Sequence, residues 1–170
     1  MTSDKKLLDD KVGVLIVYDS KEGRTKKMAF GIAEGVKKVK GASVIVKNVD
    51  ETKNEDLLKA DAIIIGSPTY YGQMSMKIKD LFDKSVKIHG KLDGKVGAAF
   101  TSSGGTATGA ETTLLSILEA MMIHGMIVQG RSEDKHYGAA ALNEPNQKDL
   151  GNCRNLGERT AKLTLKLRSK

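Results

Sequence analysis

The chain has 170 residues, of which 39% are hydrophobic and 29% charged, with a formal net charge of +7. This composition argues against disorder, and we expect one domain over residues 1–170 whose first ten residues form a polar tail without a signal core. No apolar run reaches the roughly 20 residues needed to cross a membrane, and the single cysteine, Cys153, excludes an internal disulfide framework and indicates a reducing, cytoplasmic location.

Short apolar runs rich in β-branched residues recur along the chain and predict five strands. Three of these runs are almost continuously apolar, as expected of strands covered on both faces. The five runs are Val12–Tyr18, Ser43–Asn48, Ala62–Gly66, Val96–Thr101 and Met126–Gly130.

Helical patterns lie between these runs, because apolar residues recur there at three- and four-residue spacing. The alternation of strand and helix predicts an α/β fold, with a five-stranded parallel sheet between two layers of helices. The stretch Arg131–Pro145 lacks periodicity and is predicted to be a functional loop. The predicted helices run from about Lys26 to Gly41, over Met76–Val86, over Leu114–Met122 and over Gln147–Leu167, with a shorter turn over Glu55–Ala60.

A hydroxyl- and glycine-bearing loop separates the first predicted strand from the first helix. Backbone N–H groups at a helix N-terminus have no partner within the helix and attract anions, so this loop predicts a phosphate site. Lys21 and Arg24 add positive charge, and Glu22 is expected to point to water. The alternative is a plain turn in which Ser20 caps the helix. The candidate residues are Ser20, Lys21, Glu22, Gly23, Arg24 and Thr25.

A second loop follows the third predicted strand and consists of Pro68, Thr69, Tyr70, Tyr71 and Gly72. Thr69 can offer its amide and its hydroxyl to a ligand. Adjacent side chains in an extended loop point in opposite directions, so we expect at most one tyrosine to stack on a planar ligand. The alternative is that both tyrosines cover loop surface.

The third loop follows the fourth predicted strand and consists of Ser102, Ser103, Gly104, Gly105 and Thr106. Glycine lets the backbone approach a ligand closely, which suits the polar edge of a flavin ring. The alternative is a mobile surface loop.

All three loops follow strand ends, and ligands of open parallel sheets bind beyond the carboxyl ends of the strands. The loops therefore predict a flat cofactor that carries a phosphate. Other chemistry has little support: the three histidines are isolated, so no metal site is expected, and the Walker, dinucleotide and nucleophile-elbow motifs are missing. We assign no catalytic acid or base, since a flavin would carry the chemistry.

The positive charge raises the question of nucleic-acid binding, which requires cations that converge on one surface. The lysines occur in ones and twos among acidic residues, at positions expected on the outer faces of helices. There is no tryptophan, and aromatic residues make up 4% of the chain. We expect no nucleic-acid partner.

Several segments are collinear with a known family. The chain resembles the flavodoxin-like superfamily, and within it the WrbA-type NAD(P)H:quinone oxidoreductases. The segments that carry this resemblance are Gly66–Met74, Gly94–Gly97, Phe100–Thr106, Glu111–Thr113, His124–Val128 and Tyr137–Ala139.

This resemblance implies a flavodoxin-like sandwich with strand order 2-1-3-4-5 and FMN held by the three loops. It also implies NADH or NADPH as electron donor, a quinone or similar small molecule as acceptor, and a homo-oligomer, dimer or tetramer. A flavodoxin-type electron carrier is the alternative, although such carriers are usually acidic and this chain is basic. A binding module that has lost its flavin is a third possibility.

Overall fold

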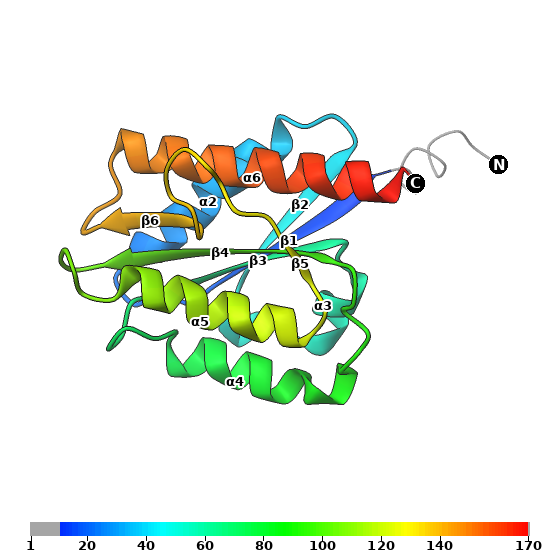
Figure 1. Ribbon diagram of the computed structural model, residues 1–170, viewed down its shortest axis with the longest axis horizontal. Coiled ribbons are helices and arrows are strands. Elements are labelled where there is room, and N and C mark those ends of the chain that lie inside the picture. Colours follow the sequence, from blue (N-terminus) through cyan, green and yellow to red (C-terminus); the bar gives the residue numbers. More distant parts are fainter. Residues whose placement is uncertain (1–10, 170) are drawn as a thin grey trace.

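A parallel sheet forms the middle layer of the computed structural model, which describes residues 11–169 (Figure 1). Its strand order is β2-β1-β3-β4-β5, which confirms the predicted topology. The predicted polar tail of residues 1–10 lies outside the described residues. The strands on this path are β1 (Val12–Tyr18), β2 (Ala42–Asn48), β3 (Ala62–Pro68), β4 (Val96–Ser103) and β5 (Ile127–Val128).

The fifth position of the sheet is split between two strands, so the prediction of five strands was incomplete. β5 has two residues, shorter than predicted, and pairs with Val96 and Gly97 at the start of β4. A sixth strand, β6 (Ala139–Leu142), pairs with the end of β4. β6 lies within the stretch predicted to be a loop. The alanines of β6 have low β propensity, so the local sequence does not favour a strand here. The segment is a strand because it pairs with the open edge of β4.

Helices cover both faces of the sheet, which confirms the predicted three layers. Figure 1 shows α2 and α6 on one face and α4 and α5 on the other. None of the helices described between residues 11 and 169 is both long and apolar enough to span a membrane. The helices are α2 (Arg24–Lys37), α3 (Asn54–Lys59), α4 (Met76–Lys84), α5 (Ala110–Ile123) and α6 (Gln147–Arg168), with 3-10 turns at Val49–Glu51 and Ser85–Ile88.

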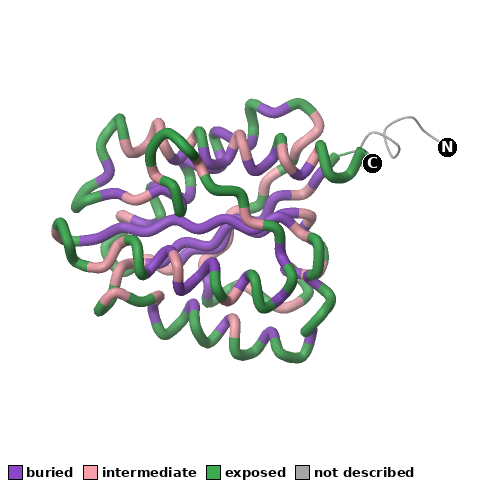
Figure 2. Tube along the Cα trace, viewed as in Figure 1, coloured by how far each residue is buried: buried purple, intermediate pink, exposed green. Residues whose placement is uncertain are grey.

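Each face of the sheet has its own hydrophobic core, because successive strand residues point to opposite faces. Along β1, Val14 and Ile16 pack with the core under α2 and α6, whereas Leu15 and Val17 pack with the core under α3, α4 and α5. Figure 2 shows long buried stretches along the central strands, and β1, β3 and β4 are almost entirely buried. A continuously apolar run therefore marks a strand buried on both sides.

Candidate functional site

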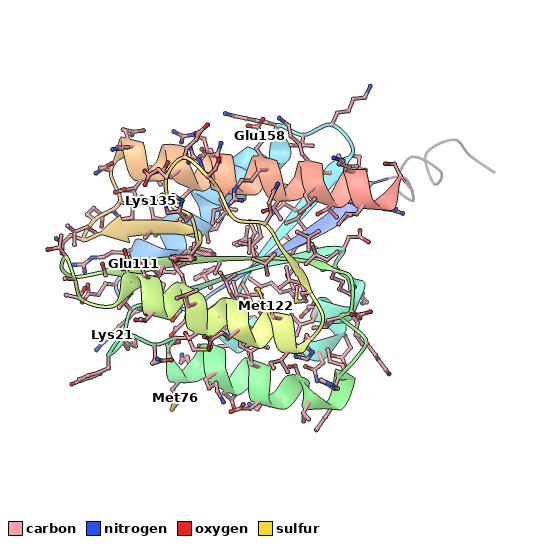
Figure 3. The ribbon with its side chains drawn as sticks, in the orientation of Figure 1. Lys21, Met76, Glu111, Met122, Lys135 and Glu158 are labelled. Atoms are coloured by element: carbon pink, nitrogen blue, oxygen red, sulfur yellow. The ribbon has the colours of Figure 1, made fainter. Side chains whose placement is uncertain are left out.

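The carboxyl ends of β1, β3 and β4 meet at one end of the sheet, and the three predicted loops converge there. They enclose a pocket of about 120 Å³. In Figure 3, Lys21 and Glu111 mark this end of the molecule. The residues that line the pocket are Ser20, Lys21, Glu22, Arg24, Thr25, Pro68, Thr69, Tyr70, Ser102, Ser103 and Gly104.

The remaining predicted site residues belong to the same three loops but lie outside the pocket wall. Gly23 precedes α2, and Tyr71 and Gly72 form the tip of the second loop. Gly105 and Thr106 follow the pocket-lining part of the third loop. Direct ligand contacts by these five residues stay a prediction.

The N-terminus of α2 forms one wall of the pocket. Gly23 has φ +88°, a left-handed conformation that favours glycine, and its carbonyl accepts the first helical hydrogen bond, from Lys27 N at 2.9 Å. The N–H groups of the first helical turn, from Arg24 to Lys26, therefore have no partner within the helix. Ser20 Oγ accepts a hydrogen bond from Gly23 N at 3.1 Å, so it stabilises the turn before the helix and leaves these N–H groups available.

The charged residues of the first loop differ in how their charges are paired. The Glu22 side chain is 62% exposed, as expected, and it also pairs with Arg24 at 3.0 Å. Both residues line the pocket. Within residues 11–169, no ion pair involves Lys21, which also lines the pocket. The first loop therefore presents one cation whose charge is not balanced by a bonded carboxylate.

A pair of buried hydroxyl groups links the first loop to the third. Thr25 Oγ1 and Ser102 Oγ lie 2.9 Å apart, and the two residues are 1% and 6% exposed. The bond between them uses one of their two hydroxyl hydrogens. The other stays available, so the pair can donate one hydrogen bond to a group in the pocket.

The second loop offers fewer donors than expected. Thr69 N donates to Ser102 O at 2.8 Å, so the Thr69 amide is already used by the backbone of β4. Thr69 Oγ1 lies 2.9 Å from Thr101 Oγ1. Thr69 therefore faces the pocket with its hydroxyl oxygen alone.

The two adjacent tyrosines lie in a tight turn closed by reciprocal backbone hydrogen bonds between Tyr70 and Gln73, at 3.2 and 3.0 Å. The central residues, Tyr71 and Gly72, have φ values of 50° and 71°, as in a type I′ turn. Tyr70 lines the pocket and is 45% exposed, whereas Tyr71 is fully exposed. Gly72 packs closely against Gly109 at the start of α5.

The third loop is anchored by hydrogen bonds on both sides of Gly104. Ser103 Oγ donates to Gly105 O at 3.2 Å, and Ser103 O accepts from Asn143 N at 2.7 Å. A Cβ added to Gly104 would meet nothing within 4 Å. The backbone at Gly104 is therefore open to the pocket, while its neighbours are held in place.

The groups with perturbed pKa values lie elsewhere. Burial raises the pKa of the Cys153 thiol in α6 to about 12. Burial lowers the pKa of Lys95, whose ammonium donates to the carbonyls of Leu58 and Ala60. Burial, with the nearby His89, lowers the pKa of His124. The arrangement of the pocket favours binding of an anion and of a flat ring over acid–base catalysis.

The fold and the pocket together define a doubly wound α/β protein with an anion-binding site at the carboxyl end of its sheet. A family model described as a flavodoxin domain matches residues 15–143. The chain belongs to this flavodoxin family, and membership implies FMN as the cofactor.

Relatives of the chain carry two kinds of name. A protein of Aquifex aeolicus named flavodoxin is 42% identical over 156 residues, covering 87% of this chain and 84% of its own. A protein of Archaeoglobus fulgidus named NAD(P)H dehydrogenase (quinone) is 36% identical over 188 residues, covering 91% and 98%. The crystal structure of a flavodoxin, WrbA-like protein from Agrobacterium tumefaciens matches with a TM-score of 0.79 at 28% identity, covering 92% of this chain and 99% of that one.

The donors fit the phosphate of FMN: unpaired N–H groups at the start of α2, a free hydroxyl hydrogen from Thr25 and Ser102, and the Lys21 cation. The sequence-based interpretation missed one residue of the pocket's support, Thr101. It is fully buried and forms the end of a predicted strand. Its role depends on Thr69 from the neighbouring segment, so no local pattern could have revealed it.

Proposed function

We propose that this protein binds FMN at the convergence of the three loops and carries electrons through it. The observation that supports this most directly is the clustering of unpaired donors from α2 with the hydroxyl pair of Thr25 and Ser102. When bound, FMN supplies the two-electron redox chemistry. The residues of the pocket hold the phosphate, orient the ring and limit its contact with water.

The first loop holds the phosphate in this proposal. The N–H groups of Arg24, Thr25 and Lys26 point out of the helix end and donate to its oxygens. Lys21 contributes a charge, and the pairing of Glu22 with Arg24 keeps that carboxylate from repelling the phosphate.

The second and third loops hold the ring. Tyr70 lies in the pocket wall and stacks on one face of the ring. The open backbone around Gly104 accepts and donates hydrogen bonds at the polar edge of the ring. Tyr71 is fully exposed at the tip of the turn, and we propose that it covers the outer part of the ring.

We further propose that the protein is an NAD(P)H-dependent oxidoreductase that passes two electrons to a quinone or similar acceptor. The support is the name of the Archaeoglobus relative, which aligns over nearly its whole length, and the net positive charge, which attracts the phosphates of a nicotinamide cofactor. A homo-oligomeric state and a cytoplasmic location stay predictions, and light scattering after size-exclusion chromatography tests the first.

A flavodoxin-type electron carrier is the second candidate, and one observation favours it. The alignment with the Archaeoglobus protein extends over 188 residues, more than the 170 residues of this chain, so that relative has segments which this chain lacks. The alignment with the Aquifex flavodoxin extends over only 156 residues. A compact chain with an exposed Tyr71 suits electron transfer to a protein partner.

The first experiment is the visible spectrum of the purified protein, followed by titration with FMN. A yellow protein, or a colourless one that takes up FMN stoichiometrically, supports the proposal. A protein that binds no FMN refutes both candidates. Oxidation of NADH and NADPH with benzoquinone then separates them: turnover well above that of free FMN supports the enzyme, and turnover equal to it supports the carrier.

A pair of glycine variants tests the location of the phosphate. Gly23→Val introduces a β-branched residue where φ is +88°, directly before α2, and should weaken FMN binding at least tenfold. Gly90→Val is the matched control, since Gly90 also has a positive φ, +78°, and open space around it but follows the 3-10 turn Ser85–Ile88 and belongs to none of the three loops. Thr25→Leu should act like Gly23→Val, because it removes the buried hydroxyl bonded to Ser102. Equal FMN affinity in all three variants would place the phosphate elsewhere.

A further inference from the structure

The hydrogen bonds around Thr101 determine the direction of the bond between Thr101 and Thr69. Thr101 Oγ1 donates its only hydrogen to Ser67 O at 2.7 Å. It therefore has no hydrogen left for Thr69, and the 2.9 Å bond between the two hydroxyls must run from Thr69 Oγ1 to Thr101 Oγ1. Thr101 is fully buried at the end of β4 and Thr69 is half-buried in the pocket wall, so water does not compete at Thr101.

This direction leaves Thr69 as an acceptor only. Its amide hydrogen goes to Ser102 O and its hydroxyl hydrogen goes to Thr101. What remains for a ligand is a lone pair on Thr69 Oγ1, and a lone pair binds only to a donor. If the ligand group next to Thr69 were also an acceptor, its lone pair would point at the lone pair of Thr69 Oγ1. Such a contact is unfavourable in a partly buried site.

The acceptor character of Thr69 Oγ1 matters because the hydrogen-bonding groups of a flavin ring change when the ring is reduced. The oxidised ring has one N–H group, N3–H on its imide edge, and its N5 is an acceptor. A hydride delivered to N5 brings two electrons and one hydrogen, while its donor is oxidised by the same two electrons. N5 thereby changes from an acceptor to an N–H donor.

We propose that Thr101 is a positioning residue that holds the Thr69 hydroxyl as an acceptor and so favours the reduced over the oxidised flavin. The inference rests on the proposed function, in which the third loop binds the imide edge. In this proposal, the donor that faces Thr69 is the N–H group that N5 would gain on reduction. Thr101 raises the reduction potential without touching the ring.

The test is the reduction potential of the FMN-loaded protein, with the affinity for oxidised FMN measured in parallel by fluorescence titration. Thr101→Val keeps the shape of the side chain and removes its hydroxyl, so Thr69 can turn its hydrogen toward N5. The ratio of reduced-state to oxidised-state affinity should fall three- to tenfold, where tenfold corresponds to about 30 mV for a two-electron couple. Thr101→Ser, which keeps the hydroxyl, should restore the original potential.

A double-mutant cycle separates this role from a structural one. In a Thr69→Val background, Thr101→Val should leave the potential unchanged, because no hydroxyl remains to be oriented. If Thr101→Val does not fold, Thr69→Val alone should lower the potential and Thr69→Ser should not. A potential that is unchanged in Thr101→Val, or a shift that persists without the Thr69 hydroxyl, overturns the inference alone. Failure of the unmodified protein to bind FMN overturns the proposed function as well.

Discussion

Helices α2 and α6 cross at glycines, and one of these glycines gives a sharp test of the packing. A Cβ added to Gly157 in α6 would overlap the carbonyl oxygen of Ile32 and lie 3.0 Å from its carbonyl carbon and 3.1 Å from Val36 N. These atoms belong to the backbone of α2, so no side-chain rotation relieves the overlap. Gly157→Ala can be accommodated only if the two helices move apart.

The expected magnitude follows from two opposing effects. Overpacking a buried contact costs about 1–3 kcal/mol, and the upper end applies where backbone must move. Replacing glycine by alanine within a helix stabilises the helix by about 1 kcal/mol, because alanine has the higher helix propensity. The net loss for Gly157→Ala is then about 2 kcal/mol, which lowers Tm by roughly 4–8 °C in a chain of this size.

Gly151 provides the matched control in the same helix. A Cβ added to Gly151 would meet nothing within 4 Å, so Gly151→Ala keeps only the gain in helix propensity. We expect it to raise Tm by about 2–4 °C. Thermal unfolding followed by circular dichroism, with urea unfolding for the free energies, measures both variants. If the two substitutions change stability in the same direction, the argument from the helix crossing is wrong.

Three further predictions concern groups away from the pocket. Burial raises the pKa of the Cys153 thiol to about 12, so this thiol should not react with a thiol reagent at pH 8 in the native protein. It should react fully in urea. Rapid labelling of the native protein would contradict the burial of Cys153. The pKa of His124 is lowered in the folded state, so the unfolded chain binds the proton first as pH falls. The stability that is fully present above about pH 6.5 should therefore decline as the pH falls below that value. Urea unfolding should show a smaller decline for His124→Gln, and an equal decline would assign the effect to other groups. In β3, Gly66→Ala would push a Cβ into the buried ring of Phe100 and should lower stability by about 1–3 kcal/mol. Gly13→Ala in β1 should be nearly neutral, because its Cβ would make only an ordinary 3.8 Å contact. Similar urea midpoints for the two variants would refute this packing.

Much of the fold and of the candidate site could be predicted from the sequence, because the determining patterns are local. The strands β1, β3 and β4 are buried on both faces, and each of them appears in the sequence as a nearly continuous apolar run, as in Val12–Tyr18 and Ala62–Pro68. The loop Ser20–Thr25 could be recognised because its hydroxyls, its glycine and the following helix lie within a few residues of one another. The parallel topology then brings strand ends together at one edge, so the three loops had to meet.

Other features depend on residues that are distant in sequence, and only the tertiary structure decided them. β6 exists because the end of β4 offers it backbone partners, from Phe100↔Ala139 to Ser103↔Leu142. The lysines that look scattered in the sequence are partly gathered by the packing of α2 on α6, since Lys38 and Lys162 both lower the pKa of Glu158.

The polarity of Thr69 belongs to this second group. Its hydroxyl direction follows from Thr101 and Ser67, and its amide is taken by Ser102. A hydrogen-bonding group acts as donor or acceptor according to its partners, and the two partners of Thr69, Thr101 and Ser102, lie on β4, more than 30 residues away along the chain. The sequence by itself determined which residues surround the pocket; the direction of the hydrogen bonds within it was decided by the packing of β3 against β4.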